Sequence, residues 1–154
     1  MSYAVDTNIL ARSVQENHPT HKTAKEAVKV LLQGSEQVCA LAQNFYEFWV
    51  IATRPLEQNG LGLNAAQAQL HLTEFETTLE PKPDTPAVYA EWKRLVGEHR
   101  VMGKNAHDAR IVAAMTVHGI SHLLTFNGRD FKRFQDIITV IEPGDIVQPS
   151  SVGP

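Results

Sequence analysis

Short apolar runs alternate along the chain with longer segments in which apolar residues recur every three or four positions. The short runs are typical of strands buried on both faces, and they fall at residues 3–5, 38–42, 78–80, 122–126 and 137–141. The longer segments predict amphipathic helices at residues 9–14, 20–32, 44–53, 64–75, 86–99, 105–118 and 128–134. Strands that alternate with helices predict an α/β fold in which helices cover both faces of a mostly parallel sheet.

The ends of these elements carry the residues expected of them. Gly34 and Gly119 follow helical segments, and Pro86 suits the first turn of the next helix. The run at 78–80 is the weakest strand, because Pro81 and Pro83 limit its hydrogen bonding. A chain of 154 residues fits one domain. We place that domain at residues 1–143 and expect the tail at 144–154 to be partly disordered.

Composition narrows the class of protein. Hydrophobic residues make up 43% of the chain and charged residues 20%, and no apolar run has the length of about 18 residues that a membrane helix needs. No signal-peptide pattern precedes the first strand, and Cys39 is the single cysteine, so we expect a cytoplasmic protein. The net charge of −3 argues against a surface that coats nucleic acid but allows a local basic patch.

Acidic residues follow the predicted strands. Asp6, Glu47 and Asp130 each come a few residues after an apolar run, and Asp108 lies near the start of the most apolar helix. The carboxyl ends of parallel strands meet at one edge of a sheet, where such folds bind ligands. We therefore expect these carboxylates to gather at that edge.

An asparagine precedes three of these acids by three positions. This spacing would let each asparagine cap a helix whose third residue is the acid. The alternative explanation is purely structural, with each acid contributing about 0.3 to 1 kcal/mol through the helix dipole. The pairs are Asn44 with Glu47, Asn105 with Asp108, and Asn127 with Asp130.

Gathered carboxylates need a cation. At about 4 Å and an effective dielectric constant near 20, each like-charged pair costs roughly 4 kcal/mol before screening. Mg²⁺ or Mn²⁺ suits oxygen ligands of this kind and lowers the pKa of a bound water. The pattern therefore favours metal-dependent hydrolysis of phosphodiester bonds.

Four motifs in order along the chain give a resemblance to a known family. They are VDTNIL with Asp6 and Asn8, QNFYEFW with Glu47, KNAHDARIVAAM with Asp108, and LLTFNGRDF with Asp130. Together they resemble a PIN-domain ribonuclease, and most closely the toxin subunits of bacterial VapBC toxin–antitoxin pairs. The resemblance covers nearly the whole chain. It implies a three-layer α/β/α sandwich with a mostly parallel sheet of about five strands.

The resemblance also implies roles for individual residues. Asp6, Glu47 and Asp108 would bind Mg²⁺ or Mn²⁺, and Thr7 or Asn8 would orient the first carboxylate. Family members differ in the fourth group, so either Asp130 or Asn127 could face the metal. We favour Asp130 as the fourth catalytic acid and place Asn127 behind the ligands.

Partners follow from the same resemblance. It implies an RNA substrate, a homodimer, and an antitoxin whose segment lies in a groove of the early helices and sends an Arg or Lys toward Asp6 and Asp108. Apolar residues in excess of what one helix face buries support an interaction surface. Cations near the acids could hold an RNA backbone, and Tyr46 could stand at the rim of the pocket. The apolar residues are Leu31, Leu63, Leu70 and Leu79, and the cations are Arg12, Lys104, Arg110, Arg129, Lys132 and Arg133.

Two other functions fit parts of the pattern. A phosphatase of the haloacid-dehalogenase type also has an acid after its first strand, but it needs a second acid two positions later, where this chain has Asn8. A catalytically silent PIN-like scaffold or RNA-binding module is the other alternative; a missing acid would identify it, and none of the main three, Asp6, Glu47 and Asp108, is missing.

Overall fold

A computed structural model describes residues 1–147 of the chain. Its sheet has the strand order β3-β2-β1-β4-β5, and every neighbouring pair is parallel. The prediction of an α/β fold with a parallel sheet of about five strands is confirmed. The strands are β1 (Ser2–Val5), β2 (Gln37–Leu41), β3 (Glu80–Lys82), β4 (His122–Leu124) and β5 (Thr139–Ile141).

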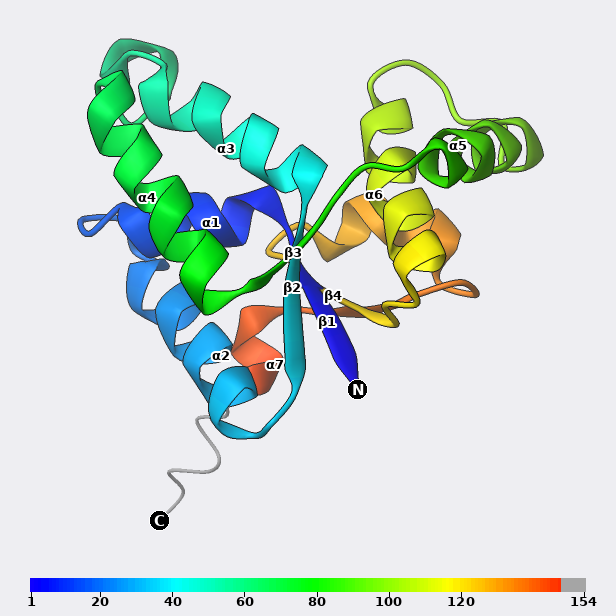
Figure 1. Ribbon diagram of the computed structural model, residues 1–154, viewed down its shortest axis with the longest axis horizontal. Coiled ribbons are helices and arrows are strands. Elements are labelled where there is room, and N and C mark those ends of the chain that lie inside the picture. The colour runs from blue at the N-terminus through cyan, green and yellow to red at the C-terminus, as the bar shows by residue number, and fades with distance from the viewer. Residues whose placement is uncertain (148–154) are drawn as a thin grey trace.

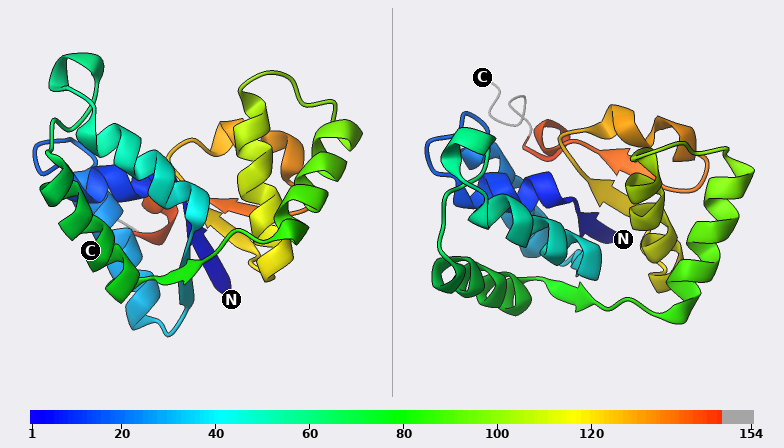
Figure 2. Two further views of the ribbon diagram at one scale, coloured as in Figure 1. Left: turned by 45° about the horizontal axis from the view of Figure 1, so that its top comes forward. Right: turned by 90° about the horizontal axis from the view of Figure 1, so that it is seen from above.

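The helices form two layers, one on each side of the sheet (Figures 1 and 2). The first layer holds α1 (Thr7–Val14), α2 (His21–Gln33), α3 (Ala42–Thr53), α4 (Ala65–Thr78) and the short α7 (Pro143–Ile146). The second layer holds α5 (Pro86–Glu98), α6 (Asn105–His118) and the 3-10 helix η2 (Gly128–Phe134). A 3-10 turn, η1 (Leu56–Gln58), lies in the connection between α3 and α4.

Side chains of alternate strand residues divide the core in two. Ala4 packs with α5, α6 and η2, whereas Tyr3 and Val5 pack with the layer of α1 to α4. β2 alternates in the same way. Cys39 packs with α5, α6 and η2, as Ala4 does, and Val38 packs with the layer of α1 to α4. Alternation follows from the two-residue period of a strand. Because both faces are covered, the central strands appear in the sequence as continuous apolar runs.

The connections change sides between β1 and β4. β1 leads into α1 on one face, whereas β4 is entered from α6 and leads into η2 on the opposite face. The two strands are neighbours, and the Asp6 amide donates to the Leu124 carbonyl just beyond their paired residues. In open α/β sheets a ligand crevice forms at such a switch point, outside the carboxyl ends of the strands. The fold therefore places Asp6 at the mouth of that crevice.

Some element boundaries differ from the sequence prediction. The third strand starts at Glu80 and includes Pro81, which the sheet accommodates because β3 is an edge strand. Residues 144–146 of the predicted tail belong to α7, which contacts α2. Leu32, the last residue of the helix predicted at 20–32, has 37% of its surface exposed near the end of α2. Residues 148–154 of the predicted tail lie outside the described residues. No helix in the described part of the chain is both long and apolar enough to cross a lipid bilayer.

Candidate functional site

Asp6 is held at the junction of β1 and α1 by several hydrogen bonds. It caps the amino end of α1, where its Oδ1 accepts from the Thr7 amide over 2.8 Å. Its Oδ2 accepts from the Thr125 hydroxyl over 2.7 Å and from the Asn8 side chain over 3.5 Å. Burial raises the pKa of Asp6, and the hydrogen bond from Thr125 acts in the opposite direction. Asp6 is therefore an oriented carboxylate in a site that penalises its charge.

Glu47 approaches Asp6 from α3 through a chain of polar contacts. The Thr7 hydroxyl donates to Glu47 Oε1 over 2.7 Å, and the buried Asn44 amide donates to that hydroxyl over 3.2 Å. Gln43 Nε2 lies 3.2 Å from Glu47 Oε2 and 2.9 Å from the His107 carbonyl at the start of α6. These contacts fix α3 against both α1 and α6. The carboxylate of Glu47 consequently faces the crevice.

Asp108 of α6 and Asp130 of η2 add two more carboxylates, which come from the helical layer on the other side of the sheet. Burial raises the pKa of Asp108 to about 6, and the carboxylates of Asp130, Asp6 and Glu47 add to the effect. Asp130 also contributes to the raised pKa of Asp6. Four carboxylates from four elements therefore act electrostatically on one another, as expected of a site that a cation would neutralise.

All four acids line one hollow of about 550 Å³. Its size lies within the range of small-molecule sites in proteins. Asn127 lines the hollow, so Asp130 and Asn127, the two candidates for the fourth group, both reach it. Thr7 and Asn8 line it too, whereas Tyr46, although exposed, is not among its lining residues.

The donor set has the chemistry of a site for a hard divalent cation. It consists of carboxylate oxygens with amide and hydroxyl groups close by, and cysteine is absent from the hollow. Within residues 1–147, no three His, Cys, Asp or Glu side chains already converge as ligands of one ion. Mg²⁺ commonly binds through one or two carboxylates and keeps several waters, so the residues fit such an ion without a complete protein cage.

The predicted asparagine caps are wrong. Asn44 is not the N-cap of α3 but its third residue, and its Oδ1 accepts from the amide of the N-cap residue Leu41, as the N3 residue of a capping box does. Asn105 is the first residue of α6, and no side chain caps that helix. Asn127 does precede η2, but its side chain makes no capping bond.

Two residues of the site were not among the candidates drawn from the sequence, although Thr125 lies within the LLTFNGRDF motif. Thr125 is fully buried at the end of β4 and contacts both Asp6 and Asn8, over 2.7 and 3.1 Å. Arg54, at the end of α3, lines the hollow, and its buried Nε has no hydrogen-bond partner among the described residues. A polar residue directly after an apolar run is the pattern that could have identified Thr125. Arg54 is positioned by Gly60, where a Cβ would lie 1.9 Å from the Arg54 carbonyl oxygen.

Cations stand on two sides of the acids. Arg12 and Arg54 line the acidic hollow from α1 and α3. A second hollow of about 460 Å³ adjoins it at Asp130 and is lined by three cations of η2, which are Arg129, Lys132 and Arg133. Within residues 1–147, none of these five cations is in an ion pair. The cations are therefore available to a polyanion that crosses the acidic hollow.

Comparison with known proteins gives one family. The chain matches the family described as PIN domain over residues 3–137. Comparison with curated protein sequences gives no match.

Solved structures with a similar fold come from several bacteria. The VapBC2 complex of Rickettsia felis, solved with a DNA fragment from its promoter, contains a chain that is 18% identical, with a TM-score of 0.62 over 92% of this chain and 98% of that one. VapBC-1 of Haemophilus influenzae is 16% identical, with a TM-score of 0.63 over 93% and 98% of the two chains. VapC20 of Mycobacterium tuberculosis, a toxin that cleaves the sarcin-ricin loop, is 21% identical, with a TM-score of 0.62 over 84% and 93%.

Proposed function

Because the chain belongs to the PIN domain family, we propose that it is a metal-dependent endoribonuclease and the toxin of a toxin–antitoxin pair. The observation that supports this most strongly is the gathering of Asp6, Glu47, Asp108 and Asp130 around one hollow at the switch point of the sheet. The toxin–antitoxin assignment is supported by fold similarity to proteins described as VapBC toxins and complexes.

We propose that Asp6, Glu47 and Asp108 bind Mg²⁺ or Mn²⁺, with Asp130 completing the site. When bound, such an ion would neutralise negative charge on the phosphoryl oxygens and lower the pKa of a water that attacks phosphorus. The hydrogen bonds from the Thr7 amide and the Thr125 hydroxyl fix the orientation of the Asp6 carboxylate in the absence of an ion. Glu47 is oriented in the same way by the Thr7 hydroxyl and by Gln43.

The high pKa of Asp108 gives this residue a second property. With the pKa raised to about 6 in the absence of an ion, its carboxyl is partly protonated in mildly acidic solution. An ion must displace that proton, so cation binding and deprotonation of Asp108 are coupled. With an ion bound, the ionised carboxylate of Asp108 can orient a water. Asp130 lines both the acidic hollow and the adjoining basic hollow.

RNA is the proposed substrate because the cations flank the acids on both sides. Arg12 and Arg54 would contact phosphates on one side of the scissile bond, and the cations of η2 would contact phosphates on the other. A strand held this way passes its scissile phosphate over the carboxylates. The phosphatase alternative is not favoured, because Asn8 is tied as an amide to Thr125 and to the Phe126 amide, and so has no acid role.

The proposed antitoxin site is a groove of about 480 Å³ between α1, α2 and α4. Val14, Val28 and Phe75 give it an apolar floor, and Lys25 and Glu74 stand along it. An amphipathic segment with apolar residues on one face suits such a groove. Of the apolar residues that suggested an interaction surface in the sequence, Leu31 and Leu79 are buried, so the excess was smaller than predicted. We propose a homodimer of toxin subunits for the active form.

Cleavage of RNA tests the proposed function directly. Purified protein should cut single-stranded or structured RNA in Mg²⁺ or Mn²⁺, and EDTA should abolish the cutting. The matched control is the exposed acid variant Asp136→Asn, which lines neither the acidic nor the basic hollow and should cut at the rate of the unmodified protein. Undiminished cleavage in EDTA would contradict the metal mechanism, and intact RNA under every metal condition would contradict the nuclease assignment.

A further inference from the structure

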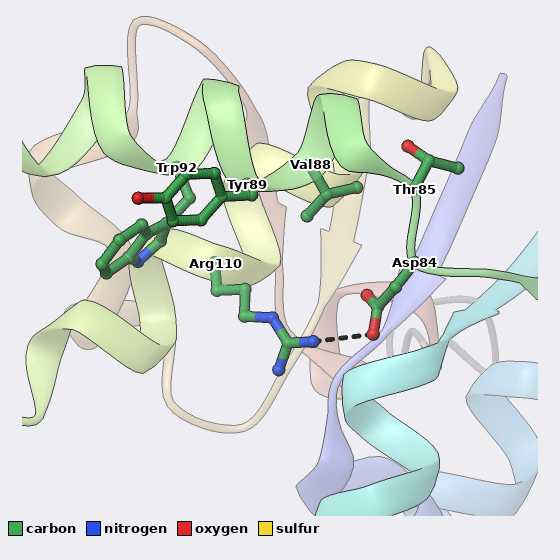
Figure 3. Close-up of a pocket in the computed structure, with 6 residues that line it drawn as sticks. All are labelled: Asp84, Thr85, Val88, Tyr89, Trp92 and Arg110. Carbon is green, nitrogen blue, oxygen red and sulfur yellow. Dashed lines mark hydrogen bonds and ion pairs between the residues drawn. The ribbon is translucent and has the colours of Figure 1, made fainter.

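Another hollow lies between α5, α6 and the connection that leaves β3 (Figure 3). Its volume is about 220 Å³, which admits a flat ring system of the size of a nucleobase. It shares no lining residue with the acidic hollow. Aromatic, aliphatic and charged side chains form its wall, which consists of Asp84, Thr85, Val88, Tyr89, Trp92 and Arg110.

Two aromatic rings form one side of this hollow. Tyr89 has 62% of its surface exposed, although its ring lies only 5.9 Å from that of Trp92, at an angle of 31°. Trp92 is held by a hydrogen bond from its indole nitrogen to the Ala106 carbonyl over 2.8 Å. The rings are too close for a third to enter between them, so a flat ligand would stack on the face that they turn to the hollow. Exposed aromatic faces of this kind bind the bases of single-stranded nucleic acid.

A charged pair forms the opposite side. Arg110 Nη2 lies 2.7 Å from Asp84 Oδ2, and the two side chains are 36% and 35% exposed. This one contact leaves the other guanidinium N–H groups and Asp84 Oδ1 able to bind a ligand. The edge of guanine offers matching groups, because its O6 and N7 accept hydrogen bonds and its adjacent N1 and N2 donate them. Arginine commonly donates to guanine O6 and N7, and a carboxylate can accept from the two neighbouring N–H groups.

The sheet places this hollow beside the acids. Lys82 of β3 pairs with Leu41 of β2, so Asp84 and Gln43 both lie just beyond the carboxyl ends of these strands. Gln43 contacts Glu47 on one side and the His107 carbonyl on the other, next to Asp108. β3 is two strands from β1, and this spacing separates their ends by about 10 Å. A nucleotide adjacent to the scissile phosphate can therefore reach the hollow.

We infer that the hollow between Tyr89 and the Asp84–Arg110 pair binds a guanine base of the RNA next to the cleavage position. This inference rests on the proposed ribonuclease function and adds a determinant of sequence preference to it. Tyr89 and Trp92 stack on the base, Arg110 donates to O6 and N7, and Asp84 accepts from N1 and N2. No part of this recognition requires the metal.

Binding of short RNA tests the inference without cleavage. An Asp6→Asn background keeps the RNA intact, and fluorescence anisotropy then compares oligonucleotides with one guanine, one adenine or one inosine in a uridine sequence. We expect about tenfold tighter binding of guanine than of adenine, with inosine between them because it lacks the N2 donors. Tyr89→Ala should weaken guanine binding about tenfold, and Asp84→Asn should remove the difference between guanine and inosine.

Control variants and a local probe make the result specific. Arg94→Gln removes a cation of α5 that is paired with Glu91 and Glu98, and Leu70→Ala removes an exposed apolar side chain of α4; neither should change base preference. Trp49→Phe leaves Trp92 as the single tryptophan. Its fluorescence should then respond to guanosine monophosphate at lower concentrations than to adenosine monophosphate, which tests the site without changing its wall.

Distinct results would overturn the inference and the proposed function. Equal affinity for all the oligonucleotides, unchanged by Tyr89→Ala, would overturn the base site even if the unmodified protein cleaves RNA. Loss of antitoxin binding on Tyr89→Ala with unchanged RNA affinity would show a protein contact instead, and would also overturn it. Failure of the unmodified protein to cleave any RNA would overturn the nuclease assignment, while the anisotropy and fluorescence results would still decide whether the hollow binds guanine.

Discussion

The Thr125 hydroxyl donates to Asp6 Oδ2 over 2.7 Å, joining two residues that are 119 positions apart in the chain. The same hydroxyl oxygen accepts from Asn8 Nδ2 over 3.1 Å and from the Asn127 amide over 3.0 Å. One buried threonine thus connects the first acid of the site to the loop that leads to Asp130. The connection spans the switch point between β1 and β4, where the two helical layers separate.

Replacement of this threonine should affect stability and the site together. Thr125→Val keeps the shape but removes the acceptor of the Asn127 N–H and the shorter of the two hydrogen bonds of the Asn8 side chain, at a cost of about 1 to 3 kcal/mol in unfolding free energy. Loss of the donor should also raise the pKa of Asp6 further, so metal affinity should fall. Thermal unfolding and Mn²⁺ titration measure both effects. Thr53→Val, which removes a hydroxyl bonded to the Trp49 carbonyl, is the control and should leave metal affinity unchanged.

Replacement of Asp6 should separate activity from stability. Asp6→Asn removes one negative charge from the group of four while an asparagine can still cap α1, so the metal-free protein should be as stable as the original or more stable. RNA cleavage should be abolished. Thermal unfolding in EDTA and a cleavage assay in Mg²⁺ check the two halves. A variant that cleaves at the original rate would show that Asp6 is not part of the catalytic site.

Stability of the metal-free protein should fall as the pH rises through the titration of Asp108. Its pKa is raised to about 6 in the fold, against about 3.9 for a free aspartate, so the fold favours the protonated form. The stabilisation is complete below pH of about 4 and is lost as the pH rises to about 6. Denaturant unfolding in EDTA across this range should show that slope, and Asp108→Asn should reduce it. The pH dependence of stability that remains in the Asp108→Asn variant is expected from Asp6, whose pKa is also raised.

RNA cleavage should change with pH in the opposite direction to the stability of the metal-free protein. A metal ion competes with the proton on Asp108, so cleavage should increase with pH through the same range. The midpoint of the increase should move to lower pH as the Mg²⁺ concentration is raised, because more ion displaces the proton at a given pH. A midpoint independent of Mg²⁺ concentration would contradict the coupling between this carboxyl and the metal.

The fourth group of the site can be identified by comparing two variants. Asp130 acts electrostatically on both Asp108 and Asp6, so Asp130→Asn should weaken Mn²⁺ binding more than Asn127→Ala does. Isothermal titration with Mn²⁺ gives the ranking, and thermal unfolding shows whether either variant has disturbed η2. The reverse ranking would assign the position to Asn127.

The antitoxin groove should depend on its apolar floor. Val28 and Phe75 line it from α2 and α4, so Val28→Asp should prevent co-purification of the proposed antitoxin while leaving RNA cleavage intact. Lys22→Asp, on the exposed part of α2, is the matched control.

Light scattering at micromolar concentration tests the proposed homodimer, and a monomeric mass would contradict it.

Local patterns predicted most elements of the fold, although not the bounds of β3 or the short helix α7. The buried strands and the helices from Pro86 and Asn105 follow from apolar spacing, proline and glycine positions, which act over a few residues. Gly119 ends α6 with a φ of +69°, a conformation that favours glycine, so that boundary could be predicted. The asparagine caps failed because a capping pattern does not specify where a helix begins. In α3 the backbone turns at Leu41, and Asn44 bonds back to it from inside the helix.

The sequence by itself therefore determined the fold class and which acids follow the strands, because both depend on short-range periodicity. Only the tertiary structure decided the surroundings of those acids. Thr125 reaches Asp6, Arg54 enters the hollow from the end of α3, and Asp108 receives the fields of three carboxylates from other elements. Contacts of this kind join residues that are distant along the chain. They arise from the strand order and the change of sides between β1 and β4, which no local pattern of residues records.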